Sequence, residues 1–383
     1  MAVAMFSGLV VRPEIVSPAD VGIAAGACPR AEQSRTPRVH HRGSGRRWPA
    51  LSQPADAHPI QGEDTHLAVA KRLLQLNWIL IAAMLVVFLG ALLLTDFRVR
   101  AGSYLIVAAV AGLYGSFGYF KMTSADSDPR IYVPLFVLPQ IFCVAMLLAS
   151  LGYIAAAANL PMQDANLLAF DRFLGLDFRA YLDFANDRPI LIGVLAKAYN
   201  SIWLQLFALL SLLGLVGHYQ RAAELVLAFA TGLIVTTGIS TLVPATGVYG
   251  ALGLLPADYS HVEPSVYYDT LRELPLVRNG TTRLLDPFEL GPLLTFPSFH
   301  AVSAALYVWA CWPIRWLRGV GLIWNSVMLA ATPIGGGHYF VDVIAGLVVA
   351  AVSIHAVNRV GRYLARSADP LRNVSPQPST AAT

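Results

Sequence analysis

Long apolar runs alternate with short polar segments along most of the chain after residue 72. An apolar run of about 20 residues is long enough to cross a bilayer as a helix. We therefore predict an all-α fold, a polytopic transmembrane helix bundle of about eight spans, at about residues 73–95, 103–120, 131–153, 190–216, 222–243, 298–314, 318–334 and 339–358.

The composition supports a membrane protein. Hydrophobic residues make up 56% of the chain and charged residues 13%, whereas soluble domains carry about 25% charged residues. The three cysteines, Cys28, Cys143 and Cys311, are isolated, which favours neither a disulfide framework nor a cysteine-based metal site. We expect the membrane, and no nucleic acid, as the partner of the chain.

The two ends of the chain differ in kind from the spans. Residues 1–65 contain arginines among Pro, Ser and Gly without sustained periodicity, which predicts a disordered basic tail. Residues 362–383 are predicted to form a disordered C-terminal tail. Basic residues flank the first and last spans, which places both ends in the cytoplasm by the positive-inside rule. Such an arrangement suits a bacterial inner membrane.

Two longer inserts, at 154–189 and 244–297, interrupt the spans. In the first, apolar residues are interleaved with Asp and Arg at helical spacing, which predicts a helix lying at the membrane interface. The second is rich in Pro, Gly, Tyr and Arg. With eight spans, the second insert lies on the non-cytoplasmic face.

Two short polar segments carry the candidate chemistry. They are FPSFHA at residues 296–301 and GGGHYFVD at residues 335–342. Ionisable residues are costly inside a membrane segment and are therefore functional candidates. The order of the spans brings His300 and His338 to the same non-cytoplasmic face, beside the second insert.

The spacing within each segment indicates a role. Asp342 follows His338 by four residues, so on a helix it lies one turn away and is able to hold the imidazole in one tautomer. The glycines that precede His338, among them Gly337, leave room for a ligand to approach the backbone. Ser298 stands where a helix is expected to begin, so its side chain is predicted to cap that helix. The N–H groups of such a helix end attract an anion.

Each feature also has a purely structural interpretation. A single histidine at a membrane interface is more often a hydrogen-bonded structural group. Tyr199 and Asn200 are interpreted as packing and interhelical hydrogen bonding. Asp171 and Arg172 are interpreted as a local ion pair. The occurrence of both histidine segments at one face, beside an arginine-bearing insert, is what favours chemistry.

The pairing of PSFHA with HYFVD resembles the type 2 phosphatidic acid phosphatase superfamily, also called lipid phosphate phosphatases. Members carry a Pro-Ser-x-His segment followed by a His-x-x-x-Asp segment. FPSFHA and GGGHYFVDVIAG are most similar to the branch that includes inositolphosphorylceramide synthases. The resemblance covers roughly residues 130–360, which implies a six-span catalytic core at 126–361 and two accessory spans at 66–125.

The resemblance implies a role for each matching residue. His338 would be the nucleophile that forms a phosphohistidine, oriented by Asp342. His300 would protonate the leaving oxygen and then activate water or an alcohol. Ser298 and nearby backbone N–H groups, including that of Gly337, would hold phosphate oxygens. No metal and no cofactor are expected, because protein donors offset the developing charge.

The sequence departs from the family pattern at two places. The family's first motif, Lys-x6-Arg-Pro, is absent; Arg188-Pro189 imitates its end, but Tyr181 stands where the Lys is expected. We therefore assign the phosphate-binding arginine to Arg278, whose neighbours Asn279-Gly280 form a turn. Ala331-Thr332 replaces the Ser-Arg pair that the family carries before the nucleophile.

Three classes of function are weighed. The leading one is a lipid phosphate phosphatase or phosphotransferase at the non-cytoplasmic face, acting on a lipid phosphate or a phospholipid. A membrane transporter is a second class, and a metal-dependent hydrolase that uses the same His and Asp cluster is a third. The sequence leaves open the lipid, the acceptor, the choice between phosphatase and phosphotransferase, and the oligomeric state.

Overall fold

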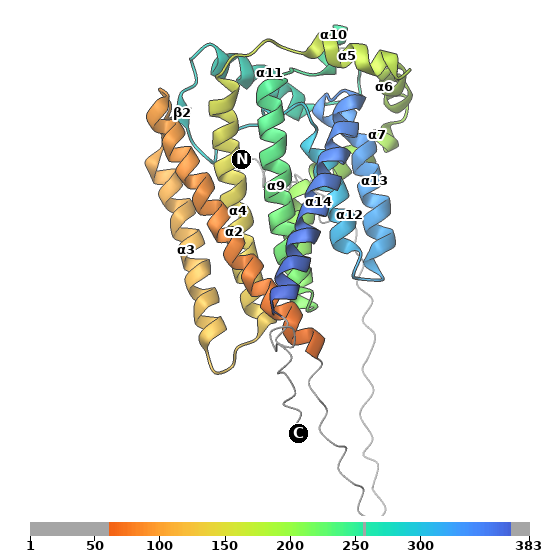
Figure 1. The fold of residues 1–383 in the computed structure, drawn as a ribbon. Coiled ribbons are helices and arrows are strands. Elements are labelled where there is room, and N and C mark those ends of the chain that lie inside the picture. The colour runs from red at the N-terminus through yellow and green to blue at the C-terminus, as the bar shows by residue number, and fades with distance from the viewer. Residues whose placement is uncertain (1–60, 256–257, 369–383) are drawn as a thin grey trace, which may run out of the picture.

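The computed structural model describes residues 61–255 and 258–368, which form a bundle of helices with one short pair of strands (Figure 1). The elements, in chain order, are α2 (Gln61–Leu94), β1 (Arg98–Val99), α3 (Ala101–Thr123), α4 (Pro129–Ala156), α5 (Asp164–Phe173), α6 (Phe178–Asn186), α7 (Pro189–Asn200), α8 (Ile202–Leu215), α9 (Tyr219–Leu242), α10 (Val248–Leu252), α11 (Ser265–Arg278), β2 (Leu284–Leu285), α12 (Phe299–Cys311), α13 (Leu317–Gly336) and α14 (Phe340–Ala368).

Local sequence explains where several helices begin. The side chain of Asp128 accepts a hydrogen bond from the N–H of Arg130 (2.9 Å) at the start of α4, and Pro129 occupies the first helical position. Asp177 caps α6 in the same way by accepting from the N–H of Ala180 (3.2 Å). Aspartate is a preferred N-cap residue. Proline is favourable at the first helical position because the N–H that it lacks would have no partner within the helix.

The prediction of an all-α polytopic bundle is confirmed. Within the described residues, five helical segments are long and apolar enough to cross a membrane: Thr65–Leu94, Ala101–Thr123, Pro129–Ala156, Tyr219–Leu242 and Phe340–Ser367. The helices α7 and α8 form a sixth span if they are counted as one, with a bend of 53° between them.

Judged by helix length and apolar composition, the predicted count of eight spans is too high. The segments predicted at 298–314 and 318–334 are the helices α12 and α13, and neither is among the described helices that meet both conditions. With 13 residues, α12 has a length of about 20 Å, shorter than a hydrocarbon core of about 30 Å. The apolar run continues after Cys311, but the chain leaves the helix there and turns before α13.

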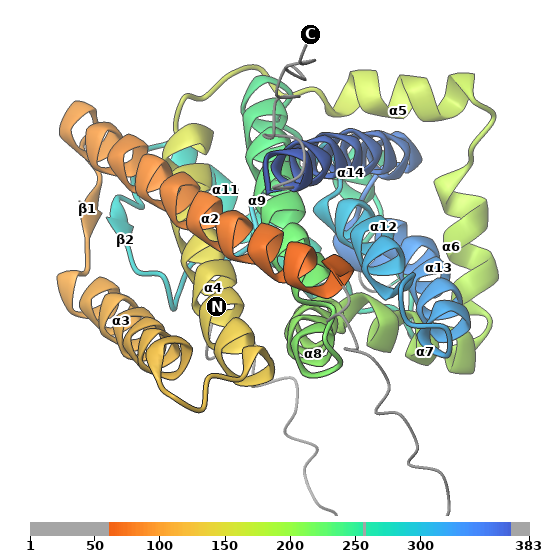
Figure 2. The ribbon, with the colours of Figure 1, turned by 60° about the horizontal axis from the view of Figure 1, so that its bottom comes forward.

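The helix α9 lies at the centre of the bundle, where it contacts α2, α4, α8, α12 and α14 (Figure 2). The helix α3 packs mainly on α4, whereas α2 contacts α4, α9 and α14. Of the two segments interpreted as accessory spans, α2 is thus part of the central packing. The predicted tails lie mostly outside the described residues, but 61–65 and 362–368 are helical, within α2 and α14.

Both inserts cover the same end of the bundle (Figure 1). The helices α5, α6, α10 and α11, which we call the covering layer, lie across this end. The parallel pair β1 and β2 joins the layer to the first helix hairpin through Arg98↔Leu284 and Val99↔Leu285. The helix α2 begins, and α14 ends, at the opposite end. Because α14 begins beneath the layer, both histidine segments lie at the covered end.

A buried pair of amides ties α2, α4 and α9 together. The Nδ2 of Asn77 donates to Oε1 of Gln140 (3.2 Å) and to the carbonyl of Ala223 (3.2 Å), and Nε2 of Gln140 donates to the carbonyl of Leu74 (2.8 Å). Both side chains are almost completely buried. Buried polar groups of this kind hold membrane helices together because lipid offers no alternative partner.

We predict that Gln140→Leu destabilises the protein, since it leaves the amide of Asn77 and the carbonyl of Leu74 with fewer partners. A double-mutant cycle with Asn77→Leu should give a coupling energy on the order of 1 kcal/mol. The measurement is unfolding of the detergent-purified protein by SDS titration. Strictly additive single variants would show that the two amides are not coupled.

Candidate active site

His338 lies in the short connection between α13 and α14, opposite Asp342. Its Nδ1 is 3.1 Å from Oδ2 of Asp342, and the two side chains are 4% and 0% exposed. A carboxylate accepts hydrogen bonds and does not donate them, so Nδ1 carries the proton of this bond. In the neutral imidazole, Nε2 is then the unprotonated nitrogen, with its lone pair free for another partner.

Backbone contacts fix the start of α14, and with it Asp342. The N–H of Tyr339 donates to Oδ2 of Asp342 (3.0 Å), and the N–H of Ser298 donates to its carbonyl (3.0 Å). The second contact joins the two histidine segments directly. The orientation of His338 therefore depends on both segments being in place.

Asp171 of α5 caps α14 from the covering layer. Its two carboxylate oxygens accept from the N–H groups of Phe340 and Val341, both at 2.8 Å. Burial raises the pKa of this carboxyl, and the two N–H donors partly oppose that change. The interpretation of Asp171 and Arg172 as a local ion pair is wrong, because the carboxylate is committed to the helix end.

A second carboxylate of α5 connects the covering layer to the residue after His338. The Oδ1 of Asp164 accepts from the N–H groups of Thr246 (3.0 Å) and Gly247 (2.9 Å) and from the hydroxyl of Tyr339 (2.9 Å). Asp164 and Asp171 thus hold the loop after α9 and the first turn of α14 in one arrangement.

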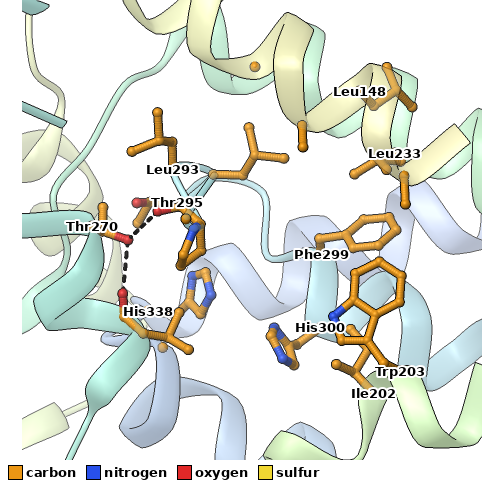
Figure 3. A pocket seen from close by; sticks show the side chains of 18 of the residues that line it. Leu148, Ile202, Trp203, Leu233, Thr270, Leu293, Thr295, Phe299, His300 and His338 are labelled. Carbon is orange, nitrogen blue, oxygen red and sulfur yellow. Dashed lines mark hydrogen bonds between the residues drawn. The ribbon is translucent and has the colours of Figure 1, made fainter. Parts of the chain in front are cut away.

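His300 belongs to the first turn of α12 and shares a cavity with His338 (Figure 3). Its ring stacks on Tyr199, with ring centroids 3.8 Å apart and an interplanar angle of 11°. The cavity has a volume of about 140 Å³ and runs into the bundle between α4, α8, α9 and α12. Its lining is mostly apolar and includes Leu148, Trp203, Leu233, Leu293 and Phe299.

Ser298 occupies the N-cap position of α12 as predicted, but its side chain does not cap the helix. The residue is completely buried, and its Oγ has no hydrogen-bond partner among the described residues. It is not among the residues that line the cavity of the two histidines. The structure thus brings the backbone of Ser298 to Asp342, and does not bring its hydroxyl into the cavity.

Gly337 also differs from its predicted role in phosphate binding. It ends α13 with φ +65°, and its N–H donates to the carbonyl of Pro333. Its carbonyl accepts from the N–H of Val248 (2.8 Å). Both backbone groups are therefore occupied, and glycine is required here by the left-handed conformation. Of the three consecutive glycines before His338, Gly336 is the one that lines the cavity.

Arg278, the predicted phosphate-binding arginine, does not line the cavity of the two histidines. It ends α11, donates from Nη2 to the carbonyl of Leu160 (2.8 Å) and borders a separate, smaller cavity. Other arginines near this end also have structural partners: Arg272 binds Asp269 and Glu273, Arg283 binds Asp96, and Arg100 binds Asp286. No lysine or arginine of the described chain lines the cavity.

Sequence reasoning missed three residues of this region. Asp164 and Asp171 accept hydrogen bonds from backbone N–H groups of distant segments. A local sequence pattern does not predict such contacts. Tyr199, interpreted as a packing residue, lines the cavity beside both histidines. Within residues 61–255 and 258–368, no group of three or more His, Cys, Asp or Glu side chains is arranged to hold a metal ion.

Comparison with protein-family models matches residues 165–356 to the PAP2 superfamily. The match covers half of the chain and contains both histidine segments. The chain therefore belongs to the PAP2 superfamily, the type 2 phosphatidic acid phosphatases that its paired motifs resemble, and membership supports a phosphatase-type function. The match begins after α4, although α4 contributes residues to the cavity. Searches of curated proteins and of solved structures gave no match.

We predict that Gly336→Ala lowers turnover of a phosphate ester on the order of 10²-fold, the scale associated with a misplaced reacting group. An added Cβ would lie 2.7 Å from Nε2 of His338 and 2.6 Å from the hydroxyl of Tyr199, so one or both of these side chains have to shift. The measurement is phosphate release or lipid-product formation by the purified variant.

Gly193→Ala in α7 is the matched control, because a Cβ there meets no atom within 4 Å. This variant should retain wild-type turnover. Wild-type turnover in Gly336→Ala, at normal expression, would show that turnover does not depend on the placement of His338 and Tyr199 beside Gly336.

Proposed function

We propose that this chain is an integral-membrane lipid phosphate phosphatase or phosphotransferase that works through a phosphohistidine on His338. One observation carries the proposal. Nδ1 of His338 is engaged by the buried carboxylate of Asp342, which leaves Nε2 free beside a cavity that His300 also lines. A nucleophile oriented by a carboxylate, with a second proton-transfer group nearby, is the arrangement that covalent catalysis requires.

In the first half-reaction, the lone pair on Nε2 of His338 attacks the phosphorus, and the bond to the leaving oxygen breaks. Asp342 keeps the proton on Nδ1 and stabilises the positive charge that develops on the ring. His300, protonated at this stage, gives a proton to the leaving oxygen.

In the second half-reaction, neutral His300 removes a proton from water or from an alcohol. The oxygen attacks the phosphorus while the bond between phosphorus and nitrogen breaks, which returns His338 to its starting state. Water gives a phosphatase and an alcohol gives a phosphotransferase, so the two activities share every residue of the site.

The lining of the cavity supports a lipid substrate. Side chains of α4, α8 and α9 surround its inner part and are mostly apolar, so the apolar portion of a substrate would lie among them while the phosphate meets the histidines. Small-molecule sites commonly combine an apolar lining with a few placed polar groups.

The charge of the cavity favours a phosphodiester over a phosphomonoester. The lining contains no lysine or arginine of the described chain. Moving an unpaired anion from water into an apolar site is costly, and the cost rises steeply with its charge. A singly charged diester, the substrate of head-group transfer, is easier to accommodate than a doubly charged monoester. This preference agrees with the resemblance to the inositolphosphorylceramide-synthase-like branch.

The same proposal places the site at the non-cytoplasmic face, in a bacterial inner membrane with the site toward the periplasm. Arg72, Arg359, Arg362 and Arg366 lie at the end of the bundle opposite the covering layer. Because cytoplasmic flanks are enriched in basic residues, this end is assigned to the cytoplasm.

We predict that His338→Ala abolishes turnover and that His300→Ala lowers it by about 10²–10⁴-fold, the usual contribution of general acid–base catalysis. Asp342→Asn should also reduce turnover because the amide no longer fixes the tautomer of His338. Rapid quenching of wild type with a phosphorus-labelled phospholipid panel should trap acid-labile, base-stable label on the protein. Lipid products and released phosphate are measured in the same samples.

Two controls separate the other classes of function. A metal-dependent hydrolase would lose activity with EDTA and carry no label, whereas a transporter would give neither label nor product. Turnover of wild type without trapped label at any quench time, together with inhibition by EDTA, would replace the phosphohistidine mechanism with a metal-dependent one.

The orientation is tested with single cysteines at exposed positions of the two ends. Thr281→Cys, near the covering layer, should react with a membrane-impermeant thiol reagent in intact cells. Ser367→Cys, at the end of α14, should react only after the membrane is disrupted. The reverse pattern would place the site in the cytoplasm.

A further inference from the structure

Tyr199 is the last aromatic residue of α7, directly before the bend of 53° between α7 and α8. Its side chain is 3% exposed, and its hydroxyl has no hydrogen-bond partner within the described part of the chain. A buried polar atom without a partner is rare in folded proteins and calls for an explanation. Tyr199 also lines the cavity of the two histidines, so a ligand in that cavity is able to reach it.

The ring of Tyr199 is held on two sides. One face stacks on the imidazole of His300 at 3.8 Å. On another side, a Cβ on Gly335 would stand only 2.7 Å from Cγ of Tyr199, so the ring lies directly against the backbone of α13. Both contacts limit the positions open to the hydroxyl.

The hydroxyl of Tyr199 and Nε2 of His338 both pack closely against Gly336. The point where a Cβ on Gly336 would stand is 2.6 Å from the hydroxyl and 2.7 Å from Nε2. The two atoms are therefore close neighbours, with no room for a side chain between them, and Tyr199, Gly336 and His338 all line the cavity. A phosphoryl group that bonded to Nε2 from the cavity would bring its oxygens toward this hydroxyl.

We propose that Tyr199 is a catalytic residue whose hydroxyl donates a hydrogen bond to a non-bridging oxygen of the phosphoryl group on His338. The proposal rests on the proposed function, in which His338 is the nucleophile. Tyr199 keeps its proton throughout, and no bond to it forms or breaks. It acts by stabilising the negative charge on the phosphoryl oxygens as the transition state forms.

The surroundings explain why a neutral donor matters here. No lysine or arginine of the described chain lines the cavity, so a cation is not available to these oxygens from the protein's own lining. A hydroxyl aimed at them in a site of low polarity is already oriented and gives a stronger interaction than it would in water. The stacking on His300 also places this donor beside the group that transfers the proton.

The test is Tyr199→Phe, which keeps the ring and its stacking and removes only the hydroxyl. We expect kcat to fall on the order of 10²-fold, the scale for loss of one transition-state donor, with KM nearly unchanged. Binding of orthovanadate, which mimics the five-coordinate transition state, should weaken by a similar factor. Thermal stability should stay the same or rise, because the lost hydroxyl had no partner in the folded protein.

Tyr307→Phe is the matched control. Tyr307 is completely buried in α12 and is not among the residues that line the cavity, and its hydroxyl donates to the carbonyl of Ile202 (2.9 Å). This variant should lower thermal stability and leave turnover and vanadate binding unchanged. The two tyrosines would then show opposite effects on stability and on activity.

The outcomes separate this inference from the function on which it rests. If His338→Ala is inactive and Tyr199→Phe keeps wild-type kcat and vanadate affinity, the role of Tyr199 is overturned and the proposed function stands. Loss of activity that parallels a loss of stability, with vanadate affinity unchanged, also overturns it in favour of a packing role. Normal turnover in His338→Ala would overturn both.

Discussion

The hydrogen bond between His338 and Asp342 is the interaction on which the remainder of the site depends. It joins two side chains with almost no exposure, and it exists only if the first turn of α14 is in place. Within that turn, the carboxylate of Asp342 accepts from the N–H of Tyr339, and the next two N–H groups find their acceptors in a distant segment. Asp171 of the covering layer supplies the two acceptors for its N–H groups, and the backbone of Ser298 holds the carbonyl of Asp342. Three segments distant in sequence therefore determine the tautomer of one imidazole.

The three consecutive glycines before His338 meet three different steric demands. At Gly335 the backbone lies against the ring of Tyr199, and at Gly336 it lies against both the hydroxyl of that tyrosine and the imidazole of His338. At Gly337 the chain adopts a positive φ and passes Tyr267, which a Cβ would approach to 2.7 Å. Any side chain at these positions would displace an aromatic ring or the imidazole of His338. The segment is thus a close-packed support for the site, without room for a side chain at any of the three positions.

Much of this arrangement follows from patterns that are local in the sequence. Apolar runs predict the helices, and the spacing of His338 and Asp342 predicts that they lie one turn apart. The roles of Ser298, Gly337 and Arg278 could not be predicted in the same way. Each depends on which groups of a distant segment reach it: the carbonyl of Asp342, the N–H of Val248 and the carbonyl of Leu160. Asp171 shows the reverse case, since its neighbour Arg172 suggested a local partner while its actual partners lie about 170 residues away.

The partners of the arginines at the covered end determine which charges remain available to the cavity. Arg100, Arg272 and Arg283 pair with carboxylates, and Arg278 binds a carbonyl, so their charges stabilise the covering layer and its attachment to the bundle. The cavity beneath is left with imidazoles and hydroxyls. An anion bound there would be stabilised by oriented neutral donors and by whichever proton the two histidines carry. A substrate that filled the cavity would displace water from it, so those donors would then act with less competition from solvent. A charge-paired layer outside and a cavity without lysine or arginine inside are therefore two parts of one arrangement.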